Sequence, residues 1–323
     1  MPKQSVLVAG GAGYIGSHVV KMLDRQGFHP VTFDNLSLGC REAVTCGSFV
    51  QGDLGHNADL EKLFQKHRFA AVLHFAAFID VGESVLNPAK YYLNNVAYTL
   101  NLLETMRRHQ VNHFIFSSTA AIYGIPHQPR LSETHPCAPI NPYGETKLIV
   151  EKILRDYDAA YGLKSIALRY FNAAGGDPDG VIKNFKTRDS NLIPIVLRSL
   201  KNPTSCVTIF GTDYPTPDGT CIRDYIHIED LGAAHVLALE QLLQGKDSAQ
   251  YNLGNGNGFS VREVIHAAEK VTGLKVNVIE GGRRAGDPPI LIADSTKAKQ
   301  QLGWKPHYFE LETMLAHAWK ALN

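Results

Sequence analysis

Cysteine is scarce in this 323-residue sequence, and its placement has no pattern. The five cysteines stand at irregular spacings without a CxxC pair: Cys40, Cys46, Cys137, Cys206 and Cys221. Disulfide frameworks and structural zinc sites depend on paired or regular spacings, so neither class is indicated. We therefore expect a protein of a reducing compartment, the cytoplasm, that holds no metal ion.

An excess of either charge is also missing. The sequence has 32 Lys and Arg against 31 Asp and Glu, a formal net charge of +1 at pH 7. A near-neutral chain creates no overall field that attracts nucleic acid or anionic lipid. Nucleic acid is thus not an expected partner, and any bound anion must be held by local groups.

Long hydrophobic runs are absent as well, although 44% of the residues are hydrophobic. The longest run, residues 69–79, is interrupted by His74 and is too short to span a membrane as a helix. The first residues, MPKQ, lead into a strand-like run without a basic and apolar leader. These features predict a protein that is neither secreted nor inserted in a membrane.

What the sequence does contain is an alternation of strand-like and helix-like segments. Short apolar runs predict strands at 5–9, 30–34, 70–76, 113–117 and 164–171. Helical periodicity between them predicts helices at 14–26, 60–67, 90–109 and 142–161. This order is typical of a Rossmann-type α/β fold, a doubly wound parallel sheet with helices on both faces.

The alternation loosens after Phe171, which predicts a second, smaller α/β lobe. A helix near 192–200 and a strand near 207–210 are expected in that lobe, whereas a helix near 229–243 and a strand at 250–253 resemble returns to the sheet. We therefore expect residues 1–171 to form the first domain, with returns near 225–254. Residues 172–224 and 255–323 are expected to form the second lobe.

The segment GGAGYIG places Gly10, Gly13 and Gly16 between an expected strand and an expected helix. Glycines permit a tight turn there, and the N–H groups of a helix N-terminus attract a pyrophosphate. The next expected strand ends at Asp34, whose carboxylate can accept the hydroxyls of an adenosine ribose and repels a 2′-phosphate. The combination predicts NAD rather than NADP, although the motif alone also fits a structural turn.

A second glycine cluster, residues 254–258, also stands between a strand and a helix. Ser260 and Glu263 follow it at the spacing of a capping box, and no acidic strand end is evident downstream. We interpret this cluster as a structural turn.

The segment NPYGETK places Tyr143 and Lys147 one turn apart on the inward face of the helix expected at 142–161. A buried lysine beside a tyrosine, together with a positively charged nicotinamide, is expected to lower the tyrosine pKa from about 10 toward neutrality, so that the phenolate can act as a base. Ser117, Ser118 and Thr119 end a strand at the ligand-binding edge of the sheet. Each feature alone is also typical of an amphipathic helix or a helix cap.

These motifs belong to a longer series: GGAGYIGSH, DNLSLG, HFAA, VGESV, YYLNNV, FSSTAAIYG, NPYGETK, RYFNAAG and IFGTDYPTPDGTCIRDYIHI. With them, nearly the whole chain resembles the UDP-glucose 4-epimerase branch of the extended short-chain dehydrogenases. The last motif is the most specific, because it lies in the second lobe and is not shared by the whole superfamily. The resemblance implies NAD in the first domain and a UDP-sugar in the second lobe.

The resemblance also implies roles for individual residues. Tyr143, Lys147 and Thr119 are the implied catalytic residues. The residues implied to line NAD, with Asp53 against the adenine, are Gly10, Gly13, Tyr14, Ile15, Gly16, Asp34, Asn35, Asp53, Leu54, Phe75, Ala76, Asn95, Ser117, Lys147 and Tyr170. Those implied to surround the UDP-sugar are Thr119, Tyr143, Asn172, Asn191, Leu192, Phe210, Arg223, Arg284, Asp287 and Leu291. By composition alone, Arg223 and Arg284 also fit surface salt bridges.

Two positions bear on how the chain compares with the family. Ile79 stands where many members carry a lysine near the nicotinamide ribose or the phosphates, which implies weaker retention of NAD. Leu291 stands where members that accept N-acetyl sugars tend to have a small residue, which implies a preference for glucose and galactose.

The implied reaction interconverts UDP-glucose and UDP-galactose through a transient 4-keto sugar, with Tyr143 as base and NAD regenerated in each cycle. A homodimer that pairs through residues 90–109 and 142–161 is implied as well. Another sugar-nucleotide epimerase remains an alternative. A dehydratase or decarboxylase is disfavoured because Ala120 and Ala121, which follow Thr119, cannot transfer protons. A non-catalytic NAD-sensing module is disfavoured because such proteins usually lose one residue of the Tyr–Lys pair.

Overall fold

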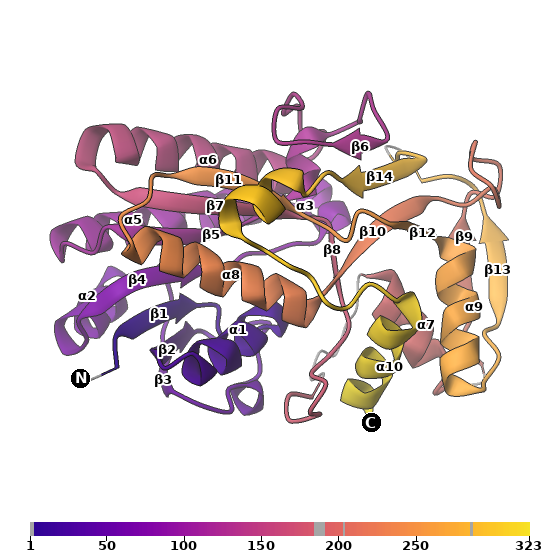
Figure 1. The fold of residues 1–323 in the computed structure, drawn as a ribbon, viewed down its shortest axis with the longest axis horizontal. Helices are drawn as coiled ribbons and strands as arrows, with labels where there is room; N and C mark the ends of the chain where they lie inside the picture. The colour runs from indigo at the N-terminus through magenta and orange to yellow at the C-terminus, as the bar shows by residue number, and fades with distance from the viewer. Residues whose placement is uncertain (1–2, 184–190, 203, 285–286) are drawn as a thin grey trace.

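A seven-stranded parallel sheet lies at the centre of the computed structural model, which describes residues 3–183, 191–202, 204–284 and 287–323 (Figure 1). Its strand order is β11-β7-β5-β4-β1-β2-β3. The strands are β1 (Ser5–Ala9), β2 (His29–Asp34), β3 (Ser48–Gln51), β4 (Phe69–His74), β5 (His113–Thr119), β7 (Lys164–Tyr170) and β11 (Ala249–Leu253). The expected strands are confirmed, including the return of β11 to the sheet beside β7. Only β3 was not expected.

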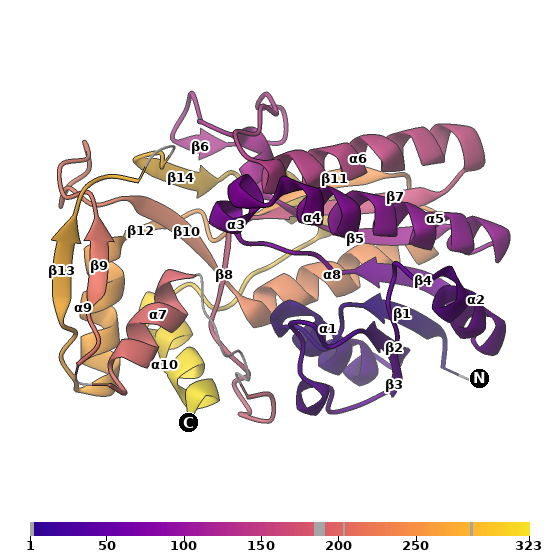
Figure 2. The same cartoon turned by 180° about the vertical axis from the view of Figure 1, so that it is seen from behind.

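Helices cover both faces of this sheet. In Figure 1, α1 (Tyr14–Arg25) and α8 (Ile228–Leu243) lie in front of the sheet. Helices α2 (Asn57–Lys66) and α5 (Tyr98–Arg108) cover the opposite face, which Figure 2 shows. The long helix α6 (Pro142–Tyr161) packs on β5 and β7. Neighbouring strand residues alternate between the two faces: Val8 belongs to the core under α1 and α8, and Leu7 to the core under α2, α5 and α6. The doubly wound Rossmann-type fold is confirmed.

The helix expected at 90–109 is present but interrupted. It consists of α4 (Pro88–Tyr91), a π-helical segment (Tyr92–Ala97) and α5. A further short helix, α3 (Val81–Leu86), begins at Asp80, whose side chain accepts a hydrogen bond from the Glu83 amide at 2.9 Å. Six residues are too few to show a helical period, so α3 could not be predicted from the sequence. Over the ranges that the structure describes, no helix is long and apolar enough to cross a membrane.

The second lobe has sheets and a core of its own, at the right of Figure 1. One sheet has the order β12-β10-β14-β6, with β8 also paired to β10, and β9 pairs with β13. These strands are β6 (Arg130–Leu131), β8 (Asn172–Ala174), β9 (Val207–Phe210), β10 (Ile222–His227), β12 (Gly258–Ser260), β13 (Val278–Gly281) and β14 (Ile290–Ala293). The helices are α7 (Leu192–Ser199), α9 (Val261–Thr272) and α10 (Leu311–Leu322). Both α7 and β9 were expected.

The glycine cluster at 254–258 holds a carboxylate of the protein itself. Buried Asp224 accepts hydrogen bonds from the amides of Asn255 at 2.7 Å, Gly256 at 3.0 Å and Ala293 at 3.0 Å. A Cβ atom on Gly254 would lie 2.4 Å from an Asp224 oxygen. The capping box of Ser260 and Glu263 at the start of α9 is confirmed. The cluster is therefore a structural turn between β11 and β12, and the Asp224 carboxylate links it to β10 and β14.

A charged cluster fastens α1 to the segment after β8. Buried Lys21 pairs with Asp177 at 2.5 Å and with Asp179 at 2.9 Å, and Arg25 also pairs with Asp179. Glu229, in the first turn of α8, has one buried carboxylate oxygen without a hydrogen-bond partner in the described part of the chain. Burial, assisted by repulsion from Asp177, raises the pKa of Glu229 to about 7. The charged form of this carboxyl is thus disfavoured in the folded state.

This shift predicts a pH-dependent effect of Glu229→Gln on stability. Between pH 4.5 and about 7 the folded protein holds the Glu229 proton more tightly than the unfolded chain, so this group makes the free energy of unfolding fall as pH rises. Glutamine removes that contribution. In urea unfolding, the variant should match the wild type near pH 5 and exceed its free energy of unfolding by about 1–3 kcal/mol near pH 8.

Glu240→Gln, later on α8, is the control and should keep the wild-type pH dependence. Equal pH slopes for Glu229→Gln and the wild type would contradict the account.

Candidate active site

A larger and a smaller cavity adjoin at the carboxyl ends of β1 and β4. The chain leaves β1 toward β2 and β3 on one side and continues with β4 and β5 on the other, so the strand order reverses between β1 and β4. Ligands of open α/β sheets bind at such a point. The larger cavity is about 380 Å³ and the smaller about 100 Å³. Gly10, Gly13 and Phe75 line both cavities.

The turn from β1 to α1 is packed so closely that two of its glycines cannot be replaced. Gly10 has a φ of +81°, and a Cβ atom on it would lie 2.4 Å from the Ala76 nitrogen. A Cβ atom on Gly16 would lie 2.3 Å from the Gly10 oxygen. Gly13 stands at the N-cap of α1, and Tyr14, Ile15 and Gly16, the first residues of the helix, line the larger cavity. An anion beside Gly13 would thus meet the positive end of the α1 dipole.

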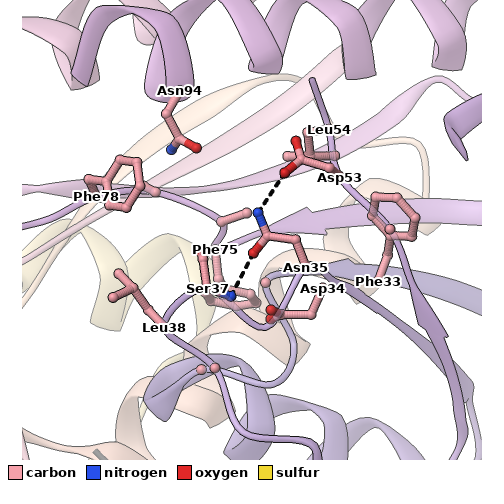
Figure 3. Close-up of a pocket in the computed structure, with 16 residues that line it drawn as sticks. Phe33, Asp34, Asn35, Ser37, Leu38, Asp53, Leu54, Phe75, Phe78 and Asn94 are labelled. Carbon is pink, nitrogen blue, oxygen red and sulfur yellow. Dashed lines mark hydrogen bonds between the residues drawn. The ribbon is translucent and has the colours of Figure 1, made fainter. Parts of the chain in front are cut away.

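Acidic and amide groups surround the smaller cavity (Figure 3). The Asp34 carboxylate accepts hydrogen bonds from the Ala12 amide at 3.0 Å and the Leu36 amide at 2.8 Å, and burial raises its pKa. Asn35 donates to Asp53 at 2.7 Å. The apolar walls are Phe33, Leu38, Leu54, Phe75 and Phe78. An acidic rim around an apolar slot fits the ribose and base of an adenosine.

The larger cavity contains the predicted Tyr–Lys pair. Asn141 caps α6 by accepting from the Gly144 amide at 2.9 Å, and the first turns of the helix place Tyr143 and Lys147 at the cavity wall. The Lys147 ammonium donates to the Ser117 carbonyl at 2.8 Å. Thr119, at the end of β5, also lines the cavity, and its hydroxyl is close enough to the Tyr143 phenol to influence the pKa of that group.

The lowering of the Tyr143 pKa that we expect from Lys147 and a charged nicotinamide together stays a prediction, because the pKa of the protein without NAD shows only the effect of the chain. Burial raises the pKa of Tyr143 to about 12, and the nearby Thr119 hydroxyl opposes this only in part. Burial also lowers the pKa of Lys147 to about 7, with Glu151 acting in the opposite direction. The sequence showed the opposite charges but not the depth of burial, which disfavours both charged forms.

A buried ion pair lies one turn further along α6. Arg169, on β7, pairs with both carboxylate oxygens of Glu151, at 3.0 Å from Nε and 2.6 Å from Nη2. The Ser118 hydroxyl donates to the same carboxylate at 2.5 Å, and Arg169 also donates to the Tyr123 hydroxyl at 3.0 Å. Glu151 and Arg169 are each at most 8% exposed. These bonds tie α6 to the ends of β5 and β7.

The structure brings most of the predicted residues to the two cavities. Those lining the smaller cavity are Gly10, Gly13, Asp34, Asn35, Asp53, Leu54, Phe75 and Ala76. Those lining the larger are Gly10, Gly13, Tyr14, Ile15, Gly16, Phe75, Ser117, Thr119, Tyr143, Lys147, Tyr170, Asn172, Asn191 and Leu291. Asn191 also stands at the N-cap of α7, as expected.

Asn95 lines neither cavity. Its side chain lies in the π-helical segment, accepts from the Phe78 amide at 2.9 Å, and donates to the Phe78 carbonyl at 3.0 Å and to Thr146 at 3.2 Å. Asn95 therefore supports the loop after β4, which lines the cavities, and the start of α6.

The other predicted substrate residues lie beyond the cavity wall, in the second lobe: Leu192, Phe210, Arg223, Arg284 and Asp287. The Arg223 guanidinium donates to Asp287 at 3.0 Å and to the Pro288 carbonyl at 2.8 Å. The Arg284 guanidinium carbon lies 3.9 Å from the centre of the Phe210 ring. A salt bridge, the alternative for Arg223, is therefore present.

Several lining residues were not identified from the sequence: Leu38, Ala77, Phe78, Val81, Asn94 and Phe171. Leu38 and Val81 are 65% and 45% exposed. Their residue types do not suggest a role in ligand binding. The signal that could have identified them was their position after β2 and β4, because ligands bind beyond the carboxyl ends of parallel strands.

The glycine turn, the paired cavities and the Tyr–Lys pair define a Rossmann-fold enzyme that uses a dinucleotide. A model of the NAD dependent epimerase/dehydratase family matches residues 6–254. A UDP-glucose 4-epimerase of Halalkalibacterium halodurans is 50% identical over 315 residues, 98% of this chain and 94% of that protein. The chain belongs to the NAD dependent epimerase/dehydratase family.

Solved structures agree with this assignment. A crystal structure of a UDP-glucose 4-epimerase has a TM-score of 0.96 and 48% identity, covering 98% of this chain and 97% of that one. The enzyme of Brucella ovis, solved in complex with NAD, has a TM-score of 0.95 and 47% identity over the same shares. NAD is the cofactor. The glycine turn at Gly13 fits its pyrophosphate, and the acidic rim formed by Asp34 and Asp53 fits its adenosine.

The buried pair behind the catalytic helix gives a prediction for stability. Removing one member of a buried ion pair leaves the other charge unpaired, at a typical cost of about 3–5 kcal/mol. Glu151→Ala should therefore lower the free energy of unfolding by about that amount, and Ser118→Ala by about 1 kcal/mol. Urea unfolding monitored by circular dichroism measures both.

Lys152→Gln, at an exposed position beside Glu151, is the control and should stay within about 0.5 kcal/mol of the wild type. A loss below about 1 kcal/mol for Glu151→Ala would show that the pair does not anchor α6.

Proposed function

We propose that this chain interconverts UDP-glucose and UDP-galactose by inverting the C4 carbon of the hexose, with NAD as a resident cofactor. The observation that carries the proposal is the placement of Tyr143, Lys147 and Thr119 in one cavity together with the glycine turn and with Asn172, Asn191 and Leu291. Relatives named UDP-glucose 4-epimerase support the choice of substrate.

We assign the residues of the site as follows. The smaller cavity takes the adenosine, with Asp34 accepting from the ribose hydroxyls and Asp53 beside the adenine. Gly13 and the start of α1 take the pyrophosphate, and Ser117, Lys147 and Tyr170 hold the nicotinamide end. Across the cleft, Arg223 and Arg284 take the second diphosphate, and Asp287 accepts from the uridine ribose. Asn172, Asn191, Leu192 and Phe210 complete the UDP site.

NAD, when bound, supplies the hydride acceptor and donor and, in its oxidised form, a positive charge. Tyr143 takes the proton of the C4 hydroxyl, and Thr119 orients the shared hydrogen bond. Because burial alone holds the Tyr143 pKa at about 12, this step needs positive charge near the phenol. Lys147 supplies part of it while it remains an ammonium, and the carboxylate of Glu151 favours that form.

The walls near Tyr143 are largely apolar. Ala120, Ala121, Phe171 and Leu291 line the cavity with Ile79. Such walls place few hydrogen bonds on the hexose, so the 4-keto sugar can turn about its diphosphate link and present its other face. Ala120 and Ala121 also offer no acid or base for dehydration, which favours the epimerase over a dehydratase.

We further propose a cytoplasmic homodimer that pairs through the α4–α5 and α6 face seen in Figure 2. Apolar side chains in and near this face support the pairing, since Val85, Leu86 and Leu93 are 60%, 87% and 52% exposed. The unpatterned free cysteines support a reducing compartment.

Conversion of UDP-galactose to UDP-glucose by purified protein, without added NAD, tests the function. The wild type should convert it, and Tyr143→Phe should lower kcat by about 10²–10⁴-fold because the general base is lost. Product is measured by a coupled dehydrogenase after the protein has been removed.

NAD binding to Tyr143→Phe should match the wild type, which is the control for folding. Undiminished conversion by Tyr143→Phe would refute the base assignment. A wild type that binds NAD but changes no UDP-sugar would revive the sensing module.

Ile79 predicts loose retention of NAD. The side chain is 44% exposed at the rim of the larger cavity and offers no charge to a phosphate. Ile79→Lys should lower the Kd for NAD by about fivefold, the equivalent of about 1 kcal/mol for a partly exposed charge–charge contact. Titration of the NAD-free protein followed by calorimetry measures the Kd.

Val81→Lys, at the same rim, is the matched control for added charge. Equal gains from both variants would mean that general attraction, rather than position 79, strengthens binding.

A further inference from the structure

Arg283 and Arg284, which follow β13, each lie over an aromatic ring at or just after the end of β9. The Arg283 guanidinium carbon lies 4.4 Å from the centre of the Tyr214 ring. The Arg284 guanidinium carbon lies 3.9 Å from the centre of the Phe210 ring. Because β13 and β9 pair in parallel with Gly281 opposite Phe210, the segments that follow the two strands begin at the same end of this sheet.

The donors of Arg283 are directed at the protein. Its Nε atom donates to the Asp213 carboxylate at 2.8 Å, and its Nη2 atom donates to the Asp213 carbonyl at 2.6 Å. The turn beneath it leaves no spare room, since a Cβ atom on Gly211 would lie 2.5 Å from the Tyr214 ring and 2.8 Å from the Arg283 Cγ atom. Arg283 is thus a clamp between the segments after β13 and after β9.

The clamp adjoins two proposed UDP ligands, Arg284 and Asp287; we call the described residues Arg283, Arg284 and Asp287 the arm. The Asp287 amide donates to the Arg284 carbonyl at 3.4 Å, and the Asp287 carboxylate accepts from Arg223 at 3.0 Å. These described residues are thus attached to the rest of the lobe at Arg283 and, through Asp287, at Arg223. Arg284 lies between these two attachments.

We infer that Arg283 is a positioning residue for the UDP part of the substrate: by clamping Asp213 and Tyr214 it holds Arg284 and Asp287 toward the ligand. The inference rests on the proposed function, which assigns Arg284 and Asp287 to UDP. Side chains that are held in place before the ligand binds lose less conformational freedom on binding. Loss of the clamp should thus weaken UDP binding and leave the chemistry at Tyr143 unchanged.

The test compares Arg283→Gln with the wild type, both loaded with NAD. We expect the Kd for UDP, measured by calorimetry, and the KM for UDP-galactose to rise together by about 3–10-fold, with kcat within about twofold. Asp213→Asn should give the same shift, and the double variant should add little to either single one, as expected for two residues that act as a pair. Arg283→Lys should recover part of the loss, since it keeps the charge without the fork.

Arg262→Gln is the matched control. Arg262 pairs with Glu280 of the same strand β13 at 2.5 Å and is comparably exposed, but it does not hold the arm. It should leave Kd, KM and kcat within about twofold of the wild type. Circular dichroism and NAD binding check that each variant is folded.

Wild-type KM and Kd values for Arg283→Gln, or a lower kcat at unchanged KM, would overturn the inference while leaving the proposed function in place. A wild type that neither binds UDP nor converts UDP-galactose would overturn both. An equal rise for Arg262→Gln would reduce the effect to general loss of surface charge and would also overturn the inference.

Discussion

The site depends on the way α6 is fixed against the carboxyl ends of β5 and β7. Glu151 on the helix binds Arg169 on β7 and Ser118 on β5, and one turn earlier Lys147 donates to the Ser117 carbonyl. These contacts set both the position and the rotation of the helix. Tyr143 is thereby placed in the same cavity as Thr119 of the strand end, and general acid–base chemistry needs both side chains within reach of the substrate hydroxyl.

The proposed UDP-sugar residues of the second lobe are brought to the same edge of the sheet by the way that lobe packs. Strand β8 follows directly on β7 and pairs with β10, which carries Arg223, while the buried Asp224 carboxylate joins β10 to the glycine cluster and to β14. Leu291 on β14 is therefore placed at the wall of the cavity that contains Tyr143. One continuous scaffold thus carries both the cofactor side and the UDP-sugar side of the proposed reaction.

Structural features that depend only on residues close together in the chain could be predicted from the sequence. The turn from β1 to α1 and the start of α6 are local motifs, since a glycine or a cap residue acts on its neighbours. Two-residue β6 and three-residue β8 could not be predicted, because such short strands are defined by partners far along the chain. The raised Tyr143 pKa of the protein without NAD could not be predicted for a similar reason: burial is a tertiary property, and the motif shows only which charges are near.

The roles of Asn95 and Arg283 also depend on distant contacts. Asn95 bonds to Phe78 and Thr146, and Arg283 bonds to Asp213 and stacks on Tyr214. The family resemblance implied Asn95 as a cofactor residue, and it gave Arg283 no role beyond being the neighbour of Arg284. In the structure, both side chains bond to other segments of the protein instead.

The fate of the hydrogen on C4 tests the central claim most directly. UDP-galactose that carries deuterium at C4 would be incubated with the enzyme in ordinary water, and the product examined by NMR and mass spectrometry. If Tyr143 handles only the hydroxyl proton while the carbon-bound hydrogen leaves and returns within one site, the product is UDP-glucose with deuterium retained at C4. Loss of the deuterium to water, or a product in which it has moved to another carbon, would contradict the account.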